Sequence, residues 1–299
     1  MCKFCEIKPV IKLISGKNLC KSCFIKYFEK KVFKTVGKYK LIDKKDKIAV
    51  AVGSGKDSFT VLYLLNELAK KRMDLDITAL AIDGGIEGYR DLRLLEKYCK
   101  ENKIKLKVVS FKKEFGYTLD EILKKLKVTS YSVYGVFRRS LLNKYARELG
   151  VNKLATGHNL DDEAQSILMN YYRDTIEVSA RLGPITGVIK DPRFVVRIKP
   201  LYFLTEKETA LYALLKKFPV IFRECPNSLS AYRGHVRDML NEFEAKHPGT
   251  KYAIINSFLE LLPSLKAKYR EEIKSCKKCK EPSSSEVCKV CQLRDKLRK

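Results

Sequence analysis

Short apolar runs alternate with amphipathic segments through the middle of the chain. We predict strands at residues 48–52, 76–82, 105–111 and 151–156. The helical spacing of apolar positions predicts helices at residues 24–40, 59–71, 91–102, 134–149 and 160–172. Residues 48–52 are apolar at every position, which is typical of a strand buried on both faces. The β-α-β-α order therefore predicts an α/β fold with a doubly wound parallel sheet.

The pattern changes after about residue 184. Residues 187–199 predict a hairpin, and further helices are predicted at residues 205–217, 230–246 and 251–268. Residues 281–286 are rich in serine and include a proline, which favours a loop. The chain after the predicted sheet is therefore expected to be mainly helical.

Eight of the ten cysteines form four Cys-x-x-Cys pairs, two near each end of the chain. The two sets are Cys2, Cys5, Cys20 and Cys23, and Cys276, Cys279, Cys288 and Cys291. Two such pairs supply the four thiolates of a closed structural zinc site, and the metal would provide folding energy for such short segments. We name these segments the N-terminal and C-terminal zinc knuckles. Unrelated free thiols are the alternative, and a redox role is disfavoured because no pair follows a strand of a βαβ unit.

The chain of 299 residues carries 61 Lys and Arg against 35 Asp and Glu, a net charge of +26. This excess indicates a polyanionic partner, either nucleic acid or an anionic membrane surface, although each lysine run alone is typical of a solvated face. No apolar run reaches the roughly 18 residues of a membrane-spanning helix, and the N-terminus lacks the apolar core of a signal peptide. We therefore expect a cytoplasmic protein with reduced thiols and no membrane partner.

A loop of small residues follows the first predicted strand and reads Gly53-Ser54-Gly55-Lys56-Asp57-Ser58. Small residues let backbone N–H groups approach a phosphate, the following helix N-terminus adds positive potential, and Lys56 adds a mobile charge. A Walker A loop is excluded because it needs a glycine where this chain has Val50, and a dinucleotide fingerprint fails at Ser58. A tight turn without a ligand remains the alternative.

This loop resembles the pyrophosphate loop of the N-type ATP pyrophosphatases. Four further segments resemble motifs of the tRNA 2-thiolation enzymes of that superfamily: ATGHNLDDEA at 155–164, GVFRR at 135–139, ECP at 224–226 and YRGH at 232–235. Zinc knuckles at both ends fit the same family. Residues 246–251, which read KHPGTK, are more similar to the branch that acts on uridine 54 of the T-loop, with the wobble-uridine (position 34) branch as the near competitor.

The resemblance implies a Rossmann-like ATP pyrophosphatase domain at residues 28–200, a helical extension at 201–270, and zinc knuckles at 1–27 and 271–299. It implies an enzyme that binds ATP and tRNA, adenylates the C2 oxygen of a uridine with release of pyrophosphate, and lets a sulfur nucleophile displace AMP. It also implies zinc at two sites, magnesium, a homodimer, and a sulfur donor that is a ubiquitin-like thiocarboxylate protein or free sulfide.

The family motifs also carry candidate site residues onto this chain. Catalytic roles fall on Asp161, Arg138 and Cys225: Asp161 would position magnesium or a water, and Arg138 or Arg139 would neutralise phosphate charge. The implied ATP-binding residues are Ala51, Gly53, Ser54, Gly55, Lys56, Asp57, Ser58, Ala81, Asp83, Arg138, Gly157 and Asp162. As an alternative, Asp161 and Asp162 are only N-terminal helix charges. His158 is interpreted as structural.

The chain departs from the family at two places. The family loop begins Ser-Gly-Gly, whereas residues 53–55 read Gly-Ser-Gly. If position 54 needs a left-handed backbone, serine is penalised there, and we expect weaker ATP binding with an unaltered fold. In the family, two cysteines of a Cys-x-x-Cys and a third cysteine hold a [4Fe–4S] cluster, and the matching positions here are Tyr131, Tyr134 and Cys225. One thiolate should not hold a cubane, and Cys99 is typical of a packed core residue, so we expect the cluster to assemble poorly or not at all.

Three interpretations follow. The first is a tRNA uridine 2-sulfurtransferase, or a chemically impaired version of one. The second is a non-catalytic tRNA-binding protein that keeps the scaffold, and the two departures are its support. The third is another ATP pyrophosphatase, such as a lysidine-forming or amide-forming ligase, and the terminal knuckles count against it.

Overall fold

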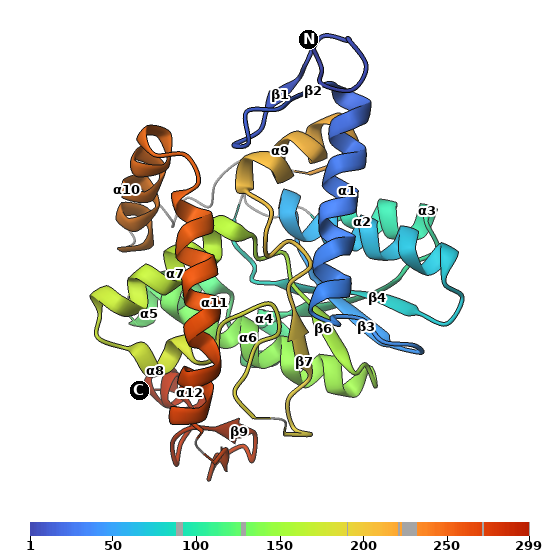
Figure 1. Ribbon diagram of the computed structural model, residues 1–299. Helices are drawn as coiled ribbons and strands as arrows, with labels where there is room; N and C mark the ends of the chain where they lie inside the picture. Colours follow the sequence, from blue (N-terminus) through green and yellow to red (C-terminus); the bar gives the residue numbers. More distant parts are fainter. Residues whose placement is uncertain are drawn as a thin grey trace.

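A single five-stranded sheet forms the centre of the molecule (Figure 1). The computed structural model describes residues 1–87, 92–126, 130–189, 191–220, 222, 232–270 and 272–298, without the side chains of 130–132. The strands are β3 (Lys47–Val52), β4 (Asp76–Asp83), β5 (Lys105–Ser110), β6 (Lys153–Ala155) and β7 (Val196–Ile198). Their spatial order is β5-β4-β3-β6-β7, and every neighbouring pair is parallel. The predicted parallel α/β sheet is therefore confirmed.

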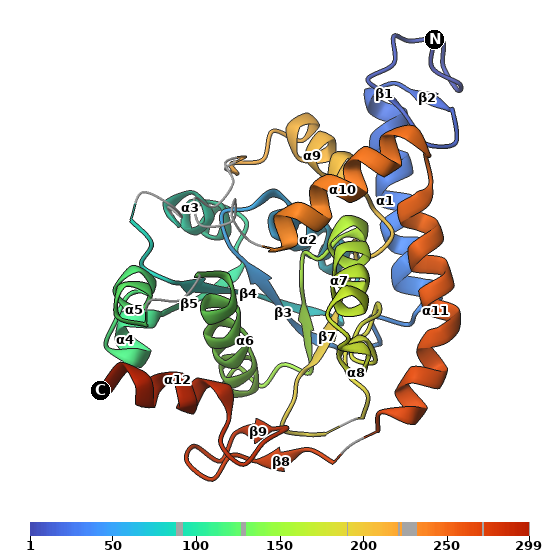
Figure 2. The ribbon, with the colours of Figure 1, turned by 90° about the vertical axis from the view of Figure 1, so that its left-hand side faces the viewer.

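Helices cover both faces of this sheet (Figure 2). Those before β6 are α1 (Lys21–Lys38), α2 (Lys56–Lys71), α3 (Arg93–Glu101), α4 (Phe111–Phe115), α5 (Leu119–Leu126) and α6 (Ser130–Glu148). Those after it are α7 (Leu160–Tyr172), α8 (Ile176–Ser179), α9 (Glu206–Leu215), α10 (Tyr232–Lys246), α11 (Thr250–Lys268) and α12 (Lys289–Arg298). Two short antiparallel pairs lie within the terminal cysteine segments: β1 (Ile11–Lys12) with β2 (Asn18–Leu19), and β8 (Lys274–Ser275) with β9 (Pro282–Ser283).

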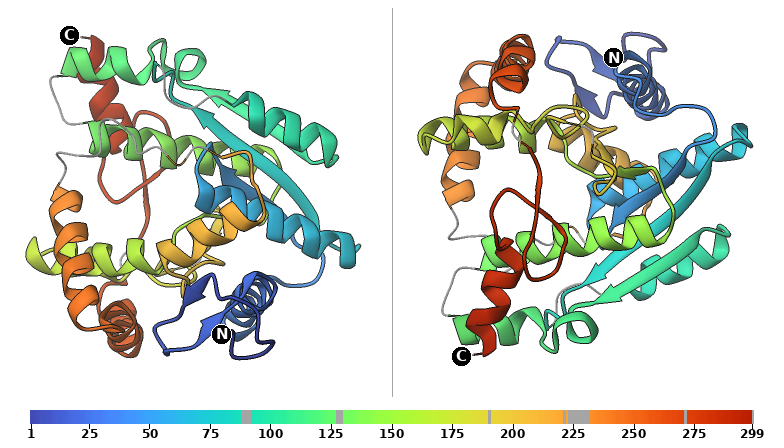
Figure 3. Two further views of the ribbon diagram at one scale, coloured as in Figure 1. Left: turned by 90° about the horizontal axis from the view of Figure 1, so that it is seen from above. Right: turned by 90° about the horizontal axis from the view of Figure 1, so that it is seen from below.

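Alternate residues of β3 supply two separate cores. Ile48, Val50 and Val52 pack with side chains of α1, α2, α3 and α9, whereas Ala49 and Ala51 pack with α5, α6 and α12. This follows from the two-residue period of a strand, which sends successive side chains to opposite faces. The two ends of the chain accordingly lie on opposite sides of the molecule (Figure 3).

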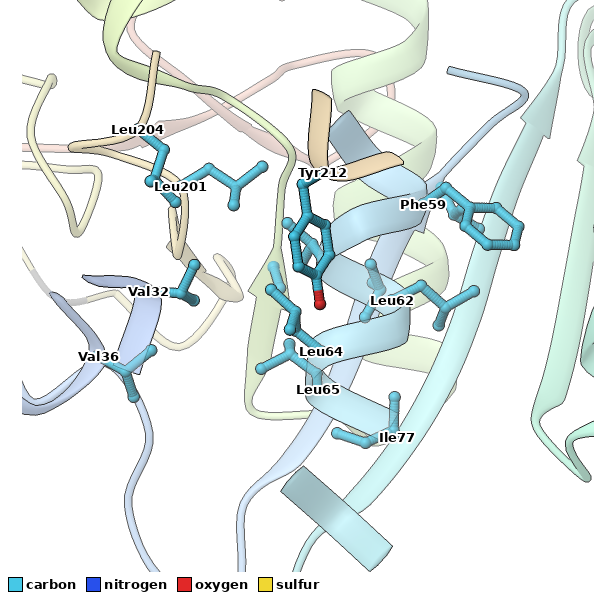
Figure 4. Close-up of a cluster of buried hydrophobic side chains, with 14 of the residues drawn as sticks. Val32, Val36, Phe59, Leu62, Leu64, Leu65, Ile77, Leu201, Leu204 and Tyr212 are labelled. Atoms are coloured by element: carbon cyan, nitrogen blue, oxygen red, sulfur yellow. The ribbon is translucent and has the colours of Figure 1, made fainter. Parts of the chain in front are cut away.

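The α2 side of the sheet holds the larger apolar cluster. Figure 4 shows Leu62 and Leu65 of α2 in one cluster with Val32 and Val36 of α1 and with Tyr212 of α9. The Tyr212 ring also stacks on the ring of Phe28 of α1. Segments far apart in the sequence therefore share this core, and it fixes α9 above the first turn of α2.

The predicted hairpin at residues 187–199 is wrong. Residues 196–198 form β7, which joins the main sheet parallel to β6. Among the described residues of this region, the only antiparallel pairing is a single bridge between Ile185 and Ile198. Pairing with β6 buries Ile198 completely in the α2-side core. β7 therefore pairs with β6 on one side and contacts residues 184–186 through this one bridge on the other.

Four helices were not predicted from the sequence: α4, α5, α8 and α12. The last of these follows the C-terminal cysteines and buries Leu293 and Leu297 in the core beside α5 and α6. Arg147 of α6 also pairs with Glu281 in the same C-terminal segment. The C-terminal knuckle is therefore fastened to α6, while the exact domain boundaries stay a prediction. No helix in the described residues is long and apolar enough to span a membrane.

Replacing Phe28 with alanine should lower the free energy of unfolding by about 3–5 kcal/mol. Phe28 is fully buried on α1, and its ring stacks on Tyr212 of α9 with centroids 4.1 Å apart. Urea unfolding at equilibrium measures the change. Phe243→Ala is the matched control, because that ring is 52% exposed and its loss should cost less than about 0.5 kcal/mol. Equal losses in the two variants would contradict the packing described here.

Candidate active site above β3 and β6

The candidate site lies where the chain leaves two neighbouring strands in opposite directions. From β3 the chain continues to β4 on one side, and from β6 it continues to β7 on the other. Such a reversal separates the connecting segments above the carboxyl ends of the two strands, which is where open α/β sheets bind ligands. Residues 53–55 and 156–159 leave the sheet at this point and lead directly into α2 and α7.

Gly157 holds these two segments in contact. A Cβ atom at this position would lie 2.5 Å from the backbone nitrogen of Ser58 and 2.8 Å from the carbonyl carbon of Asp57. Only a residue without a side chain allows backbones to approach this closely. The glycine that the sequence motif places in the ATP site therefore fixes the distance between the two loops.

The first turn of α2 is free to receive an anion. Gly55 precedes α2 and supplies no side-chain cap, so the N–H groups of the first turn lack the partner that a capping residue would give. Ser58 Oγ accepts a hydrogen bond from Gly53 N–H at 3.3 Å and donates one to Gly55 O at 3.2 Å, which closes the loop on itself. An uncapped N-terminus of a 16-residue helix is suited to phosphate.

The backbone penalty considered for Ser54 is absent. Ser54 is not among the non-glycine residues with a left-handed backbone, and neither Gly53 nor Gly55 has one. A Cβ atom added to Gly53 or Gly55 would meet nothing within 4 Å. The exchange of glycine and serine therefore causes no backbone strain at position 54, and the weaker ATP binding stays a prediction.

Lys56 lies between two carboxylates. Its Nζ is 3.1 Å from Asp57 Oδ2 and 2.8 Å from Oε1 of Glu206, the first residue of α9. Although burial lowers the pKa of Lys56, the charges of Asp57 and Glu206 outweigh it and raise that pKa. Lys56 is thus fully charged, and a polyphosphate can compete with Glu206 for it.

Asn159 connects the two loops through its side chain. Its Nδ2 donates to Asp57 Oδ1 at 3.1 Å, and its Oδ1 accepts from the backbone N–H of Asp162 at 3.1 Å. Asp162 Oδ2 accepts in return from the backbone N–H of Asn159, so the two residues form a capping box at the start of α7. Asp57 and Asp162 are therefore held close to each other.

The pKa of Asp162 rises to about 7, because burial penalises its charge and the carboxylate of Asp57 repels it. Burial likewise raises the pKa of Asp57. Two carboxyl groups with raised pKa values beside a phosphate loop are typical of a site that gains a cation with its ligand.

Asp161 occupies a different environment from Asp162. Its side chain is buried, Oδ2 accepts from the backbone N–H of Glu206 at 2.7 Å, and Oδ1 pairs with Lys251 of α11. One carboxylate oxygen is thus bound by the first residue of α9 and the other by a lysine of α11. The structure favours Asp162 over Asp161 as the acidic residue that faces the loop, and the catalytic role of Asp161 stays an untested prediction.

A group of cationic side chains lies beside the same edge of the sheet. Arg138 and Arg139 belong to α6, Arg197 belongs to β7, and Arg197 Nη2 donates to the Arg139 carbonyl oxygen at 3.4 Å. Burial and the charges of Arg139 and Arg138 lower the pKa of Arg197 to about 10. Burial, followed by the charges of Lys199 and Arg138, holds the pKa of His158 well below its usual value. Several cationic side chains therefore lie close enough in the site to affect one another's pKa values.

The remaining predicted ATP contacts lie at the ends of β3 and β4. Ala51 and Ala81 are buried within the strands. Asp83 ends β4, and its Oδ1 accepts from Gly85 N–H at 2.9 Å. His158 bonds Thr156 through Nδ1 at 2.9 Å, in keeping with a structural interpretation. Sequence reasoning missed Glu206 and Lys251; the Thr205–Glu208 capping box that opens α9 was the available signal for the start of that helix.

Comparison with known proteins agrees with this geometry. A family model described as a PP-loop domain matches residues 25–242. A tRNA-5-methyluridine(54) 2-sulfurtransferase from Pyrococcus horikoshii is 37% identical over 295 residues, covering 97% of this chain and 92% of that protein. A probable sulfurtransferase from Methanocaldococcus jannaschii is 38% identical over 292 residues, covering 95% and 84%.

The solved structure of a U34-tRNA thiolase, NcsA from Methanococcus maripaludis with its [4Fe-4S] cluster, is also similar. It matches with a TM-score of 0.84 and 37% identity, over 98% of this chain and 95% of that chain. The chain belongs to the tRNA 2-thiolation family of PP-loop proteins. The family resemblance and the fold class predicted from the sequence are thereby confirmed.

In this member of the tRNA 2-thiolation family, the four thiols of each cysteine set already lie close together. Within each set the four Sγ atoms lie within 4.8 Å of one another. Cys5 Sγ is 3.3 Å from that of Cys20 and 3.6 Å from that of Cys23, and the Sγ atoms of Cys279 and Cys288 are 3.6 Å apart. Thiolates about 2.3 Å from one tetrahedral zinc ion lie about 3.8 Å apart. Both sets therefore fit a closed four-thiolate zinc site.

The cluster positions of the family fit a [4Fe–4S] group poorly in this chain. Cys225 and the side chain of Tyr131 lie outside the described residues. The Tyr134 ring packs against Phe111 with centroids 5.6 Å apart, and its Cε2 would be 3.3 Å from a Cβ atom at Gly84. An aromatic ring thus fills a position where the cluster needs a thiolate. Two phenols and one thiol are not the donor set of an iron–sulfur cubane.

Gly157→Ala should destabilise the ligand-free protein by about 1–3 kcal/mol, because the added methyl group overlaps the backbone of residues 57–58. Thermal and urea unfolding measure this change. Gly53→Ala is the control, since its Cβ meets nothing within 4 Å, and it should cost less than about 1 kcal/mol. If both substitutions cost the same, the loops are not in close contact.

Asp162→Asn should change the pH dependence of stability in one direction. Because the folded-state pKa of about 7 exceeds the ordinary value of 3.8, the unfolded chain ionises Asp162 first, and the folded protein loses stability as pH rises through that interval. The asparagine keeps the capping oxygen but does not titrate. The free energy of unfolding of the variant, relative to the parent, should therefore rise between about pH 4 and 7 and level off above about pH 8. Urea unfolding across this range measures it, and a constant difference would refute the raised pKa.

Proposed function

We propose that the chain is an ATP-dependent sulfurtransferase that converts a uridine of tRNA into 2-thiouridine. The observation that carries this proposal is the uncapped N-terminus of α2, with Lys56 beside it, at the switch point of a thiolation-family sheet. The net charge of +26 supports a tRNA partner, since phosphate contacts dominate the affinity of proteins for nucleic acids.

The first step is attack of the uridine C2 oxygen on the α-phosphorus of ATP. The bond from the α-phosphorus to the leaving pyrophosphate breaks, the N3 proton is released, and the oxygen becomes part of a good leaving group. The loop at residues 53–58 would hold the pyrophosphate through N–H groups of α2, with Lys56 turned from Glu206 toward the phosphates. Arg138 would neutralise the charge that develops on the α-phosphate.

The carboxylates of Asp57 and Asp162 are the residues that would hold magnesium. Asn159 bonds both residues and fixes their separation, whereas both oxygens of Asp161 are already bound within the protein. Magnesium, when bound, would neutralise the leaving pyrophosphate. The adenosine would lie against the backbone near Ala81 and Asp83, at the carboxyl end of β4.

We propose uridine 54 of the T-loop as the target. The support is the likeness of residues 246–251 to that branch and the relative from Pyrococcus horikoshii that is named for this position. The wobble uridine at position 34 is the second candidate, because the similar solved structure is a U34-tRNA thiolase. In either case the base must leave its stacked position to reach the loop, at a cost of a few kcal/mol.

The remaining partners follow from the family. The sulfur donor would be a ubiquitin-like protein with a C-terminal thiocarboxylate, or free sulfide, and the chain would act in the cytoplasm as a homodimer. Zinc would fill both knuckles. A non-catalytic tRNA-binding scaffold is the second function to consider, because the substitutions at Tyr131 and Tyr134 remove cluster ligands. Pyrophosphate release separates the two functions.

Incubation with ATP, magnesium, sulfide and tRNA should release pyrophosphate only when tRNA is present and should give 2-thiouridine in the T-loop fragment. Nuclease digestion and mass spectrometry locate the modified base. Lys56→Met should slow pyrophosphate release by at least about tenfold. Lys44→Met is the control, because Lys44 is exposed near the opposite end of β3. Bound tRNA without pyrophosphate release would favour the scaffold, and label in the anticodon fragment would favour position 34.

The purified chain should contain about two zinc ions, one in each four-thiolate set. Cys276→Ser should remove one ion and weaken the packing of α12 on the core, because the thiol is buried within the C-terminal set. Elemental analysis of the dialysed protein measures the metal. Cys99→Ser should keep both ions, because Cys99 belongs to neither set. A parent protein without zinc would refute both sites.

A further inference from the structure

Almost no cysteine of this chain is free to carry sulfur at the reaction centre. Eight of the ten cysteines belong to the two knuckles. Cys99 is 1% exposed within the α2-side core, and burial raises the pKa of its thiol to about 11, so it is neither accessible nor ionised at neutral pH. Cys225 is the single cysteine that remains.

One remaining thiol does not support either of two common ways to carry sulfur. An iron–sulfur cubane needs at least three thiolates at this site, and two of the three positions are Tyr131 and Tyr134. A persulfide on Cys225 would leave a disulfide link between that residue and C2 of the uridine. A second thiol must break that link, and no other cysteine outside the knuckles is accessible.

Two arginines, Arg139 and Arg197, lie near the altered cluster position at Tyr134. Gly135 follows Tyr134, and a Cβ atom at Gly135 would be 3.0 Å from Nη1 of Arg139, so the guanidinium lies against this turn of α6. Arg197 donates to the carbonyl oxygen of Arg139. Among the described residues, neither arginine forms an ion pair, and two neighbouring cations repel each other. An anion beside them relieves that repulsion.

We propose that this chain transfers sulfur by direct attack of a hydrosulfide anion held beside Arg139 and Arg197, without an iron–sulfur cluster and without a cysteine persulfide. The inference rests on the proposed function and specifies its second step. Hydrosulfide forms a bond to C2 of the adenylated uridine, the bond from C2 to the AMP oxygen breaks, and AMP leaves with the electron pair. The proton on sulfur moves to N3, which gives the thiocarbonyl. No atom is oxidised or reduced, so the step needs no further reagent.

The first test is the iron content after anaerobic reconstitution with iron and sulfide. The parent protein should hold less than about one iron per chain, whereas Tyr131→Cys/Tyr134→Cys, which restores three thiolates, should hold about four. Iron in both proteins, or in neither, would contradict the role assigned to the two tyrosines.

The second test gives the iron-free parent protein ATP, unmodified tRNA and sodium sulfide as the only sulfur source, without oxygen. A thiolate and hydrosulfide cannot form a persulfide under these conditions, because that reaction must lose two electrons. The account predicts 2-thiouridine. Pyrophosphate release without 2-thiouridine would overturn direct attack, whereas neither product in any arm would mean that the proposed function itself fails.

Arg139→Gln tests where the anion is held. The sulfide concentration for half-maximal rate should rise by at least about tenfold, while the KM for ATP changes by less than about threefold. Arg72→Gln is the matched control, since Arg72 pairs with Asp74 far from this turn of α6. A rise in the KM for ATP that equals the rise for sulfide would show that Arg139 binds phosphate instead and would overturn this assignment.

Discussion

The close contact between two loop backbones determines the geometry of the whole site. Gly157 lies so near the backbone of Ser58 that no side chain fits between them. This contact brings the start of α7 to the start of α2, and it lets Asn159 reach Asp57. Asp162 then lies close enough to Asp57 for their charges to interact. The acidic groups and the anion-binding helix end thus share one location because a glycine allows it.

The start of α9 is the second constraint, and elements remote in sequence hold it in place. Asp161 binds the first backbone N–H of α9 and forms a buried ion pair with Lys251 of α11. Lys31 of α1 reaches Glu208 at 3.0 Å. Glu206 is thereby positioned against the phosphate-loop lysine. Loss of one partner of a buried pair is strongly destabilising, so these charges serve the fold as much as the chemistry. The adjacent acids Asp161 and Asp162 consequently have different tasks.

Local patterns predicted most of the sheet, the main helices and both cysteine sets, because apolar periodicity and cysteine spacing are visible in the sequence itself. Non-local effects produced the errors. Residues 196–198 pair with β6, a choice that depends on an open sheet edge formed elsewhere. Helix α12 has few apolar residues, and Leu293 and Leu297 are buried only because α5 and α6 receive them. The motif could not tell which of Asp161 and Asp162 faces the phosphate loop, because burial and hydrogen bonding decide this. The backbone angle at Ser54 also cannot be predicted from the sequence.

These features converge on one central claim, that ATP bound at this switch point activates the C2 oxygen of a tRNA uridine. The most direct measurement uses tRNA whose target uridine carries oxygen-18 at C2, with ATP and sulfide, followed by mass spectrometry of the nucleotide products. The account predicts that each 2-thiouridine formed leaves one oxygen-18 atom in AMP. Unlabelled AMP, with the heavy oxygen retained in the uridine or released to water, would contradict it.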